Sequence, residues 1–300
     1  MIRPSRPILL TVVVAACAPY LALKLSWLTG GSTGVREVGL MQTPLYVVAN
    51  AVTLLMDALL IAVVVVLTGE RGRRRPGRLL VGPAVLGLGL LLPVAIGAPL
   101  IGVLQLAGPP DPAADQGLAP WVYVVVYSGF VVQFVVLAIA VSVCLGRDAP
   151  VRERPTAAAR PGAGAVLVLV PAAAGIGYVA GLLAWAAGST VGLTAGDPLP
   201  RTARAFDALL AALAVAAAGL TLVVVRRRST AQQTAILVVG MSVWTWSAYL
   251  LLVSLAAPGG EPAFTPIGTL VWVSGVLAGL GAAWRVVTTD RFWAQLIGQA

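Results

Sequence analysis

The sequence contains no histidine, and Lys24 is its only lysine. Without imidazole, the chain cannot build a histidine-dependent catalytic triad, use an imidazole base, or bind zinc or haem through histidine. Cys17 and Cys144 are the only cysteines, and each lies inside an apolar block at a different expected depth, which argues against a disulfide or a metal site. With no nucleotide or cofactor motif either, we expect neither an enzyme nor a bound cofactor.

Charge is also scarce. Charged residues make up 10% of the chain and hydrophobic residues 59%, and the mean hydropathy is +0.95. In a typical soluble domain about a quarter of the residues are charged and about half are apolar. This chain has too few charged residues to cover its surface in water, so we expect it to lie in the lipid bilayer. The net charge of +9 comes from short basic clusters between apolar blocks, with no stripe of interleaved aromatics, so we expect no nucleic-acid binding.

The apolar residues fall into blocks long enough to cross a bilayer, which takes at least about 18 residues. They predict an all-α membrane protein with eight transmembrane helices. Three prolines, Pro83, Pro93 and Pro99, are expected to bend or break the third helix. The expected spans are 7–28, 44–68, 79–106, 119–145, 164–187, 205–225, 234–257 and 267–284.

The arginines between these blocks predict the orientation. If the N-terminus lies in the cytoplasm, sixteen arginines fall on the cytoplasmic side, and only Arg36, Arg201 and Arg204 fall outside. Cytoplasmic segments of membrane proteins carry such an excess of positive charge. We therefore expect a multi-pass protein of the plasma membrane with both termini in the cytoplasm.

The two halves of the sequence resemble each other. The segment Met56-Asp-Ala-Leu-Leu60 recurs as Phe206-Asp-Ala-Leu-Leu210, and a shift of 158 residues aligns several aromatic residues and turn glycines. These aligned pairs are Tyr20 with Tyr178, Trp27 with Trp185, Gly30 with Gly188, and Gly34 with Gly192. Such a pattern predicts two four-helix repeats, 1–147 and 163–300, joined by an arginine-rich cytoplasmic linker, 148–162. Because each repeat has an even number of helices, the repeats should be parallel, and the C-terminal tail is expected along the inner membrane surface.

Two ionisable residues lie within expected spans, where charge is costly and is a candidate for function. Lys24 falls in the outer part of the first span and Asp57 near the middle of the second. Side chains lean toward the N-terminus of their helix, and these two helices run in opposite directions. The lean therefore brings the two side chains together, and we predict a Lys24–Asp57 ion pair.

Helical spacing places further polar residues beside this pair, so that the first two helices share a polar face. The candidate intramembrane polar site comprises Lys24, Asp57, Asn50, Thr53, Tyr20, Tyr46 and Gln133. It is either a substrate or proton site with Asp57 as the carrier, or a buried ion pair that fixes helix packing. In the second half Leu182 aligns with Lys24, and Asp207 is expected to be a surface or capping residue.

Three segments resemble a family of uncharacterised multi-pass membrane proteins from actinobacteria: Ala18 to Leu28, Asn50 to Asp57, and Val125 to Gln133. The resemblance implies a membrane location and brings no activity or substrate with it. Two functions therefore stay open: a small-molecule or ion permease, and a non-transporting membrane scaffold, sensor or partner subunit.

Overall fold

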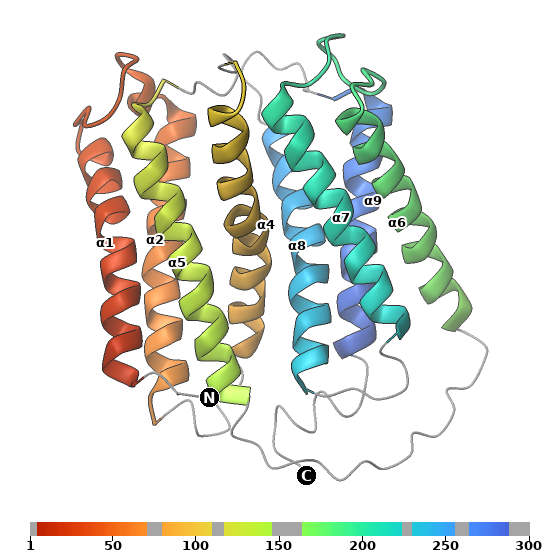
Figure 1. Cartoon of the computed structure of the whole chain (residues 1–300), viewed down its shortest axis with the longest axis horizontal. Helices are drawn as coiled ribbons and strands as arrows, with labels where there is room; N and C mark the ends of the chain where they lie inside the picture. Colours follow the sequence, from red (N-terminus) through yellow and green to blue (C-terminus); the bar gives the residue numbers. More distant parts are fainter. Residues whose placement is uncertain are drawn as a thin grey trace.

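Eight long helices stand side by side in the described part of the computed structural model, which comprises residues 5–70, 80–109, 117–145, 164–223, 230–255 and 264–287 (Figure 1). Each helix is long and apolar enough to cross a membrane. They are α1 (Arg6–Leu28), α2 (Pro44–Thr68), α4 (Val81–Leu106), α5 (Pro120–Leu145), α6 (Gly164–Ala186), α7 (Arg201–Val223), α8 (Thr230–Leu255) and α9 (Pro266–Val287), with a short 3-10 helix, η1 (Leu40–Gln42), before α2. The chain is a multi-pass, all-α membrane protein.

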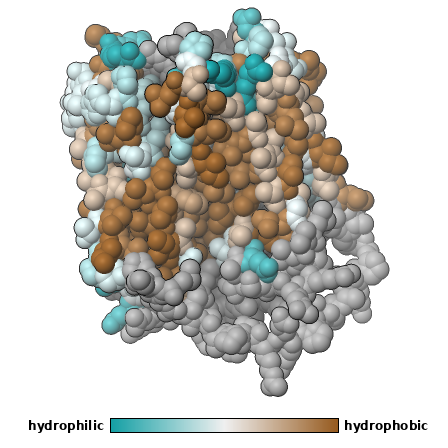
Figure 2. Space-filling view, viewed as in Figure 1, coloured by the Kyte–Doolittle hydropathy of each residue, from teal (hydrophilic) through white to brown (hydrophobic). Residues whose placement is uncertain are grey.

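Large apolar side chains cover the outside of the bundle. Figure 2 shows a broad hydrophobic belt across its middle, with hydrophilic residues gathered at the upper end. Leu55, Ile176 and Leu252 are among the exposed residues, and Leu55 is 68% exposed. A surface of this kind is stable only against lipid, since no soluble protein exposes so large a continuous apolar area.

Most helix ends lie where the sequence predicts them. The main differences are α7 and α8, which begin four residues earlier than expected, at Arg201 and Thr230. Hydropathy marks only the part of a helix that lies in the hydrocarbon region, whereas these first turns are polar. Their backbones are helical all the same, so the two helices extend beyond their apolar segments.

The prolines were expected to bend or break the third span, and the structure excludes a break. Helix α4 runs without interruption through Pro93 and Pro99, and Pro83 falls in its first turn, where a proline replaces no hydrogen bond. In the turn before Pro93, the carbonyl oxygen of Leu90 accepts a 2.9 Å hydrogen bond from the Trp246 indole on α8. Such contacts from a neighbouring helix are how membrane helices tolerate proline.

The helices form two groups that meet along α4 and α8. Helix α1 packs on α2 and α5, helix α6 packs on α7 and α9, and α4 lies between α5 and α8 (Figure 1). Gly89 allows α4 and α8 to approach closely, because a Cβ there would lie 2.6 Å from Cβ of Met241. Small residues at helix contacts serve this purpose in membranes.

The turns that follow α1 and α6 are built alike. The indole of Trp27 donates a 2.8 Å hydrogen bond to the carbonyl of Thr33, and the indole of Trp185 donates a 2.7 Å bond to that of Val191. Each turn then forms an isolated antiparallel bridge to the residues just before a later helix, Val35 with Leu118 and Leu193 with Phe264. The expected glycine turns are confirmed, since the backbone φ angles are +91° at Gly30, +73° at Gly34, +98° at Gly188 and +90° at Gly192.

Several predicted features lie outside the described residues. These are the arginine-rich linker 148–162, the arginine clusters 71–78 and 226–228, and the C-terminal tail 291–297. The described helices still place the ends of the bundle, because α1 begins and α9 ends on the same side of it (Figure 1).

Candidate intramembrane polar site

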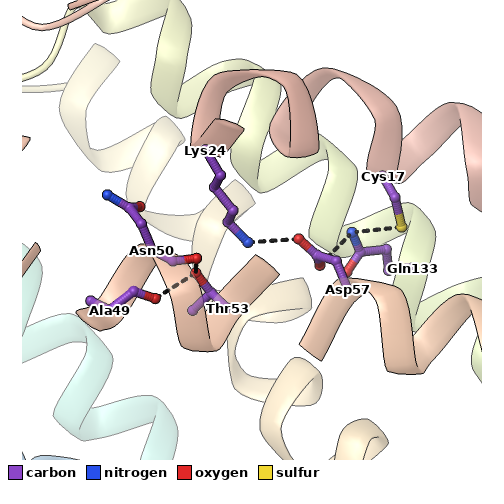
Figure 3. A network of polar contacts seen from close by, with 7 residues as sticks. All are labelled: Cys17, Lys24, Ala49, Asn50, Thr53, Asp57 and Gln133. Carbon is purple, nitrogen blue, oxygen red and sulfur yellow. Dashed lines mark hydrogen bonds and ion pairs between the residues drawn. The ribbon is translucent and has the colours of Figure 1, made fainter. Parts of the chain in front are cut away.

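Lys24 and Asp57 form an ion pair inside the membrane region, as the sequence predicts. Lys24 projects from α1 and Asp57 from α2, and Nζ lies 2.6 Å from Oδ2 of the carboxylate (Figure 3). The two side chains are 0% and 6% exposed. An ion pair of this kind is removed from both lipid and water, so the attraction between its members is only weakly screened.

Gln133 connects the pair to a third helix, α5. Its amide nitrogen donates a 3.4 Å hydrogen bond to Oδ1 of Asp57, and lies 3.3 Å from Sγ of Cys17 on α1 (Figure 3). Both carboxylate oxygens of Asp57 therefore have a partner. Gln133 and Cys17 are themselves buried, so α1, α2 and α5 meet at a closed polar centre.

The Lys24 ammonium also contacts an aromatic ring. Its Nζ lies 3.6 Å from the ring centroid of Tyr20, one helical turn away, in a cation–π arrangement. The Tyr20 ring in turn packs edge-on against Phe130 of α5, with 5.3 Å between centroids. An ammonium carries three N–H donors, yet within the described residues Lys24 makes a single hydrogen bond, to Asp57. It thus retains unused donor capacity.

The remaining predicted site residues lie along α2, and among the described residues they have no hydrogen bond to the ion pair. Asn50 is buried, and its amide nitrogen lies 3.5 Å from Sδ of Met41. The Thr53 hydroxyl donates a 2.7 Å bond to the Ala49 carbonyl of its own helix. Tyr46 is half-buried and packs at the outer end of α2. These three residues share the face of Asp57 but bond elsewhere.

Cys17 belongs to the polar centre, although it was not among the predicted site residues. The available signal was its spacing, because Cys17, Tyr20, Lys24 and Trp27 follow one face of α1. Cys17 and Cys144 are both buried, and the described residues contain no disulfide between them. In the described residues no three His, Cys, Asp or Glu side chains gather as they would around a metal ion.

The expectation for Asp207 is wrong. Asp207 is not a surface or capping residue: it is 6% exposed, and its Oδ2 has no hydrogen-bond partner among the residues that the structure describes. Because α7 already begins at Arg201, Asp207 lies in its second turn and faces the bundle. The neighbouring Arg204 points elsewhere, and its Nε donates a 2.9 Å bond to the carbonyl of Ala186 at the end of α6.

The Lys24–Asp57 centre combines one acid, one ammonium with spare donors and one amide, which suits it to binding a polar group or exchanging a proton. No protein-family model, curated protein or solved structure matches this chain, so its function has to be inferred from the geometry of these residues.

Proposed function

We propose that this chain is a small-molecule or ion permease of the plasma membrane and that the Lys24–Asp57 pair is its binding site. The proposal is carried by one observation, an ion pair buried where α1, α2 and α5 meet. Ionisable residues inside membrane spans are costly, and they commonly mark substrate or proton pathways. We assign binding and not catalysis to the pair, because the sequence contains no histidine and no cofactor or nucleotide motif.

Asp57 is the coupling group in this mechanism. When a proton from the aqueous phase reaches its carboxylate, the charge that holds Lys24 is lost and the ion pair opens. The ammonium, with its unused N–H donors, then binds an acceptor group of the solute beside the Tyr20 ring. Release of the solute and of the proton on the other side restores the pair. Each cycle would move one proton with one solute.

The architecture supports this function. Sequence duplication and the matching turns after α1 and α6 favour two parallel four-helix repeats. Parallel repeats recur in transporters, whose substrate sites lie near the midplane of the bilayer. The distribution of arginines favours cytoplasmic termini, and the resemblance to actinobacterial multi-pass proteins agrees with the plasma membrane.

Proton flux in proteoliposomes tests the role of Asp57. Solutes that raise the unfolding temperature of the purified protein are selected first and are then supplied to vesicles containing a trapped pH indicator. The parent protein and a Leu55→Ala control, altered on the exposed lipid-facing surface, are expected to take up protons with the solute. Asp57→Asn is expected to lose this uptake. Solute-driven proton uptake by Asp57→Asn at the parent rate would exclude Asp57 as the carrier.

Cys17 provides a second measurement of the same site. In a Cys144→Ser background it is the only thiol, and it lies buried beside Gln133. If solute binding opens the centre, a membrane-permeant maleimide should label Cys17 faster with the solute present than without it. A labelling rate that no stabilising solute changes would contradict the opening step.

The alternative is a non-transporting scaffold, sensor or partner subunit, in which the ion pair fixes how α1, α2 and α5 pack. The complete burial of Lys24 and the occupied carboxylate of Asp57 favour it, because both are also expected of a structural pair. Under this alternative, no solute stabilises the isolated protein and a protein partner co-purifies with it. A solute-dependent rise in unfolding temperature that requires Asp57 would instead favour the permease.

A further inference from the structure

The second group of helices contains a buried carboxylate without a cation. Asp207 on α7 matches Asp57 on α2 in the repeated segment Asp-Ala-Leu-Leu. It is buried to a similar degree, yet within the described part of the chain its Oδ2 has no hydrogen-bond partner. The position that Lys24 occupies in the first half is Leu182 in the second, and Leu182 is completely buried among apolar residues. The chain therefore supplies no lysine to neutralise Asp207.

Two further buried hydroxyl oxygens lie nearby, on helices α6 and α8. Tyr178 interacts electrostatically with Asp207, and its hydroxyl lies within hydrogen-bonding reach of Ser247. A Cβ at Gly275 would collide with both the Ser247 hydroxyl and the Tyr178 ring, so these two side chains meet at one point. Apart from this mutual approach, neither Tyr178 Oη nor Ser247 Oγ has a hydrogen-bond partner among the described residues. Buried polar atoms usually have one, so this group of three is unusual.

The charged residues of the neighbouring helices do not neutralise the carboxylate charge of Asp207. Arg204 donates to the Ala186 carbonyl, and Arg201 donates to the Leu104 carbonyl. The sequence of α4 contains no ionisable residue, α6 contains only Tyr178, and α8 only Tyr249. The one ionisable residue of α9, Arg285, falls in its last turn, at the opposite end of the bundle from Asp207.

We propose that Asp207, Tyr178 and Ser247 form a binding site for one exchangeable monovalent cation, either a proton or an alkali metal ion such as Na⁺. A carboxylate removed from water is strongly destabilised unless a positive charge neutralises it. With Leu182 in the place of a lysine, that charge has to come from solution. Carboxylate and hydroxyl oxygens are the ligands that hard cations prefer. This site is separate from the Lys24–Asp57 pair and does not depend on whether that pair transports a solute.

Two measurements on the full-length protein in detergent distinguish the two cations. The unfolding temperature is recorded in NaCl, KCl and choline chloride at constant ionic strength. The infrared carbonyl band of protonated carboxylic acids is recorded from pH 5 to pH 9. An alkali-metal site predicts a higher unfolding temperature in NaCl or KCl than in choline chloride, and a proton site predicts a carbonyl band that titrates. Asp207→Asn should lose the response that the parent shows, whereas the lipid-facing control Leu252→Ala should retain it.

A lysine introduced at residue 182 provides a test that does not require removing the carboxylate. In Leu182→Lys the new ammonium should pair with Asp207, as Lys24 pairs with Asp57, and so displace the cation. The variant should be folded and should show neither the salt-dependent rise in unfolding temperature nor the titrating band. Leu182→Met, which carries no charge, should behave like the parent. If Asp207→Asn or a folded Leu182→Lys responds as the parent does, or if the parent shows no response, the proposal is overturned.

Discussion

Lys24 and Asp57 are stable inside the bundle because each is the principal partner of the other. Their burial removes them from water, and only their mutual attraction, the Tyr20 ring and the Gln133 amide offset that loss. Removing one member of such a pair leaves an uncompensated charge in an apolar interior. Removing both leaves an apolar contact, which is a much smaller disturbance.

We therefore predict a large difference between single and double variants at the ion pair. Lys24→Met should destabilise the protein by about 3–5 kcal/mol, because Asp57 is then buried without a cation. The double variant Lys24→Met/Asp57→Leu should lie within about 1–2 kcal/mol of the parent or above it, since well-packed apolar replacements of buried pairs are often neutral. Chemical unfolding in detergent, with Leu55→Ala as the reference for an exposed site, measures both. Equal losses in the single and double variants would contradict a coupled pair.

At this scale, helical spacing and the lean of side chains were sufficient to predict the ion pair. They were not sufficient for Asn50, Thr53 and Tyr46, because spacing places residues on a face without determining which neighbour each side chain bonds. Thr53 bonds to its own helix, which no pattern of polar residues reveals. Asp207 was placed incorrectly because hydropathy put the start of its helix four residues too late, and because its neighbour Arg204 suggested a surface location.

Among the elements, α4 has the closest contact with the other group of helices. Gly89 lies against α8, where an added Cβ would meet the backbone of Met241, whereas Gly102 on the same helix has open space around it. The two glycines therefore respond differently to the same change, although both lie within one helix.

We predict that Gly89→Ala lowers the free energy of unfolding by about 1–3 kcal/mol, because α4 and α8 must separate to admit the methyl group. Gly102→Ala is the matched control. It should not lower the free energy of unfolding, and the better helix propensity of alanine should raise it by at most about 1 kcal/mol. Thermal unfolding of the two variants in the same detergent compares them directly. If the Gly89 variant is as stable as the Gly102 variant, α4 and α8 do not pack closely at Gly89.

The two indole-bonded turns offer a comparison between the halves. Trp27→Phe and Trp185→Phe each keep an aromatic ring but remove the hydrogen bond to the carbonyl six residues ahead. Because the two bonds have the same geometry, each variant should lose a similar amount of stability, about 1 kcal/mol. Trp284→Phe, on an exposed ring, serves as the reference. A loss confined to one of the two turns would show that they are not energetically equivalent.

For the whole molecule, length and hydropathy were enough to predict eight spans, because lipid requires continuous apolar helices of a minimum length. Which helices pack together was not predictable in the same way. The contact between α4 and α8 depends on the fit of Gly89 and Trp246 to their neighbours, and single apolar residues carry no such information. The turns after α1 and α6 were foreseeable from their repeated glycines.

The orientation of the molecule leads to a prediction for both ends of the chain. A fluorescent protein that folds only in the cytoplasm should be bright when fused to either terminus, and alkaline phosphatase, which is active only outside, should be inactive at both. A phosphatase fusion in the turn between α1 and α2, on the opposite side, is the positive control. Active phosphatase at one terminus alone would require an odd number of spans.

The burial of Lys24 also determines how the molecule behaves toward chemical reagents. Because Lys24 is the only lysine and its side chain is completely enclosed, the folded chain offers amine-directed dyes and cross-linkers no target except its α-amino group. In the absence of a bound solute, succinimide esters should therefore leave the intact helices unmodified, and acylation of Lys24 should appear only after α1 and α2 come apart. The fraction of chains acylated at Nζ of Lys24, measured by mass spectrometry, therefore gives the fraction in which the helix bundle has opened.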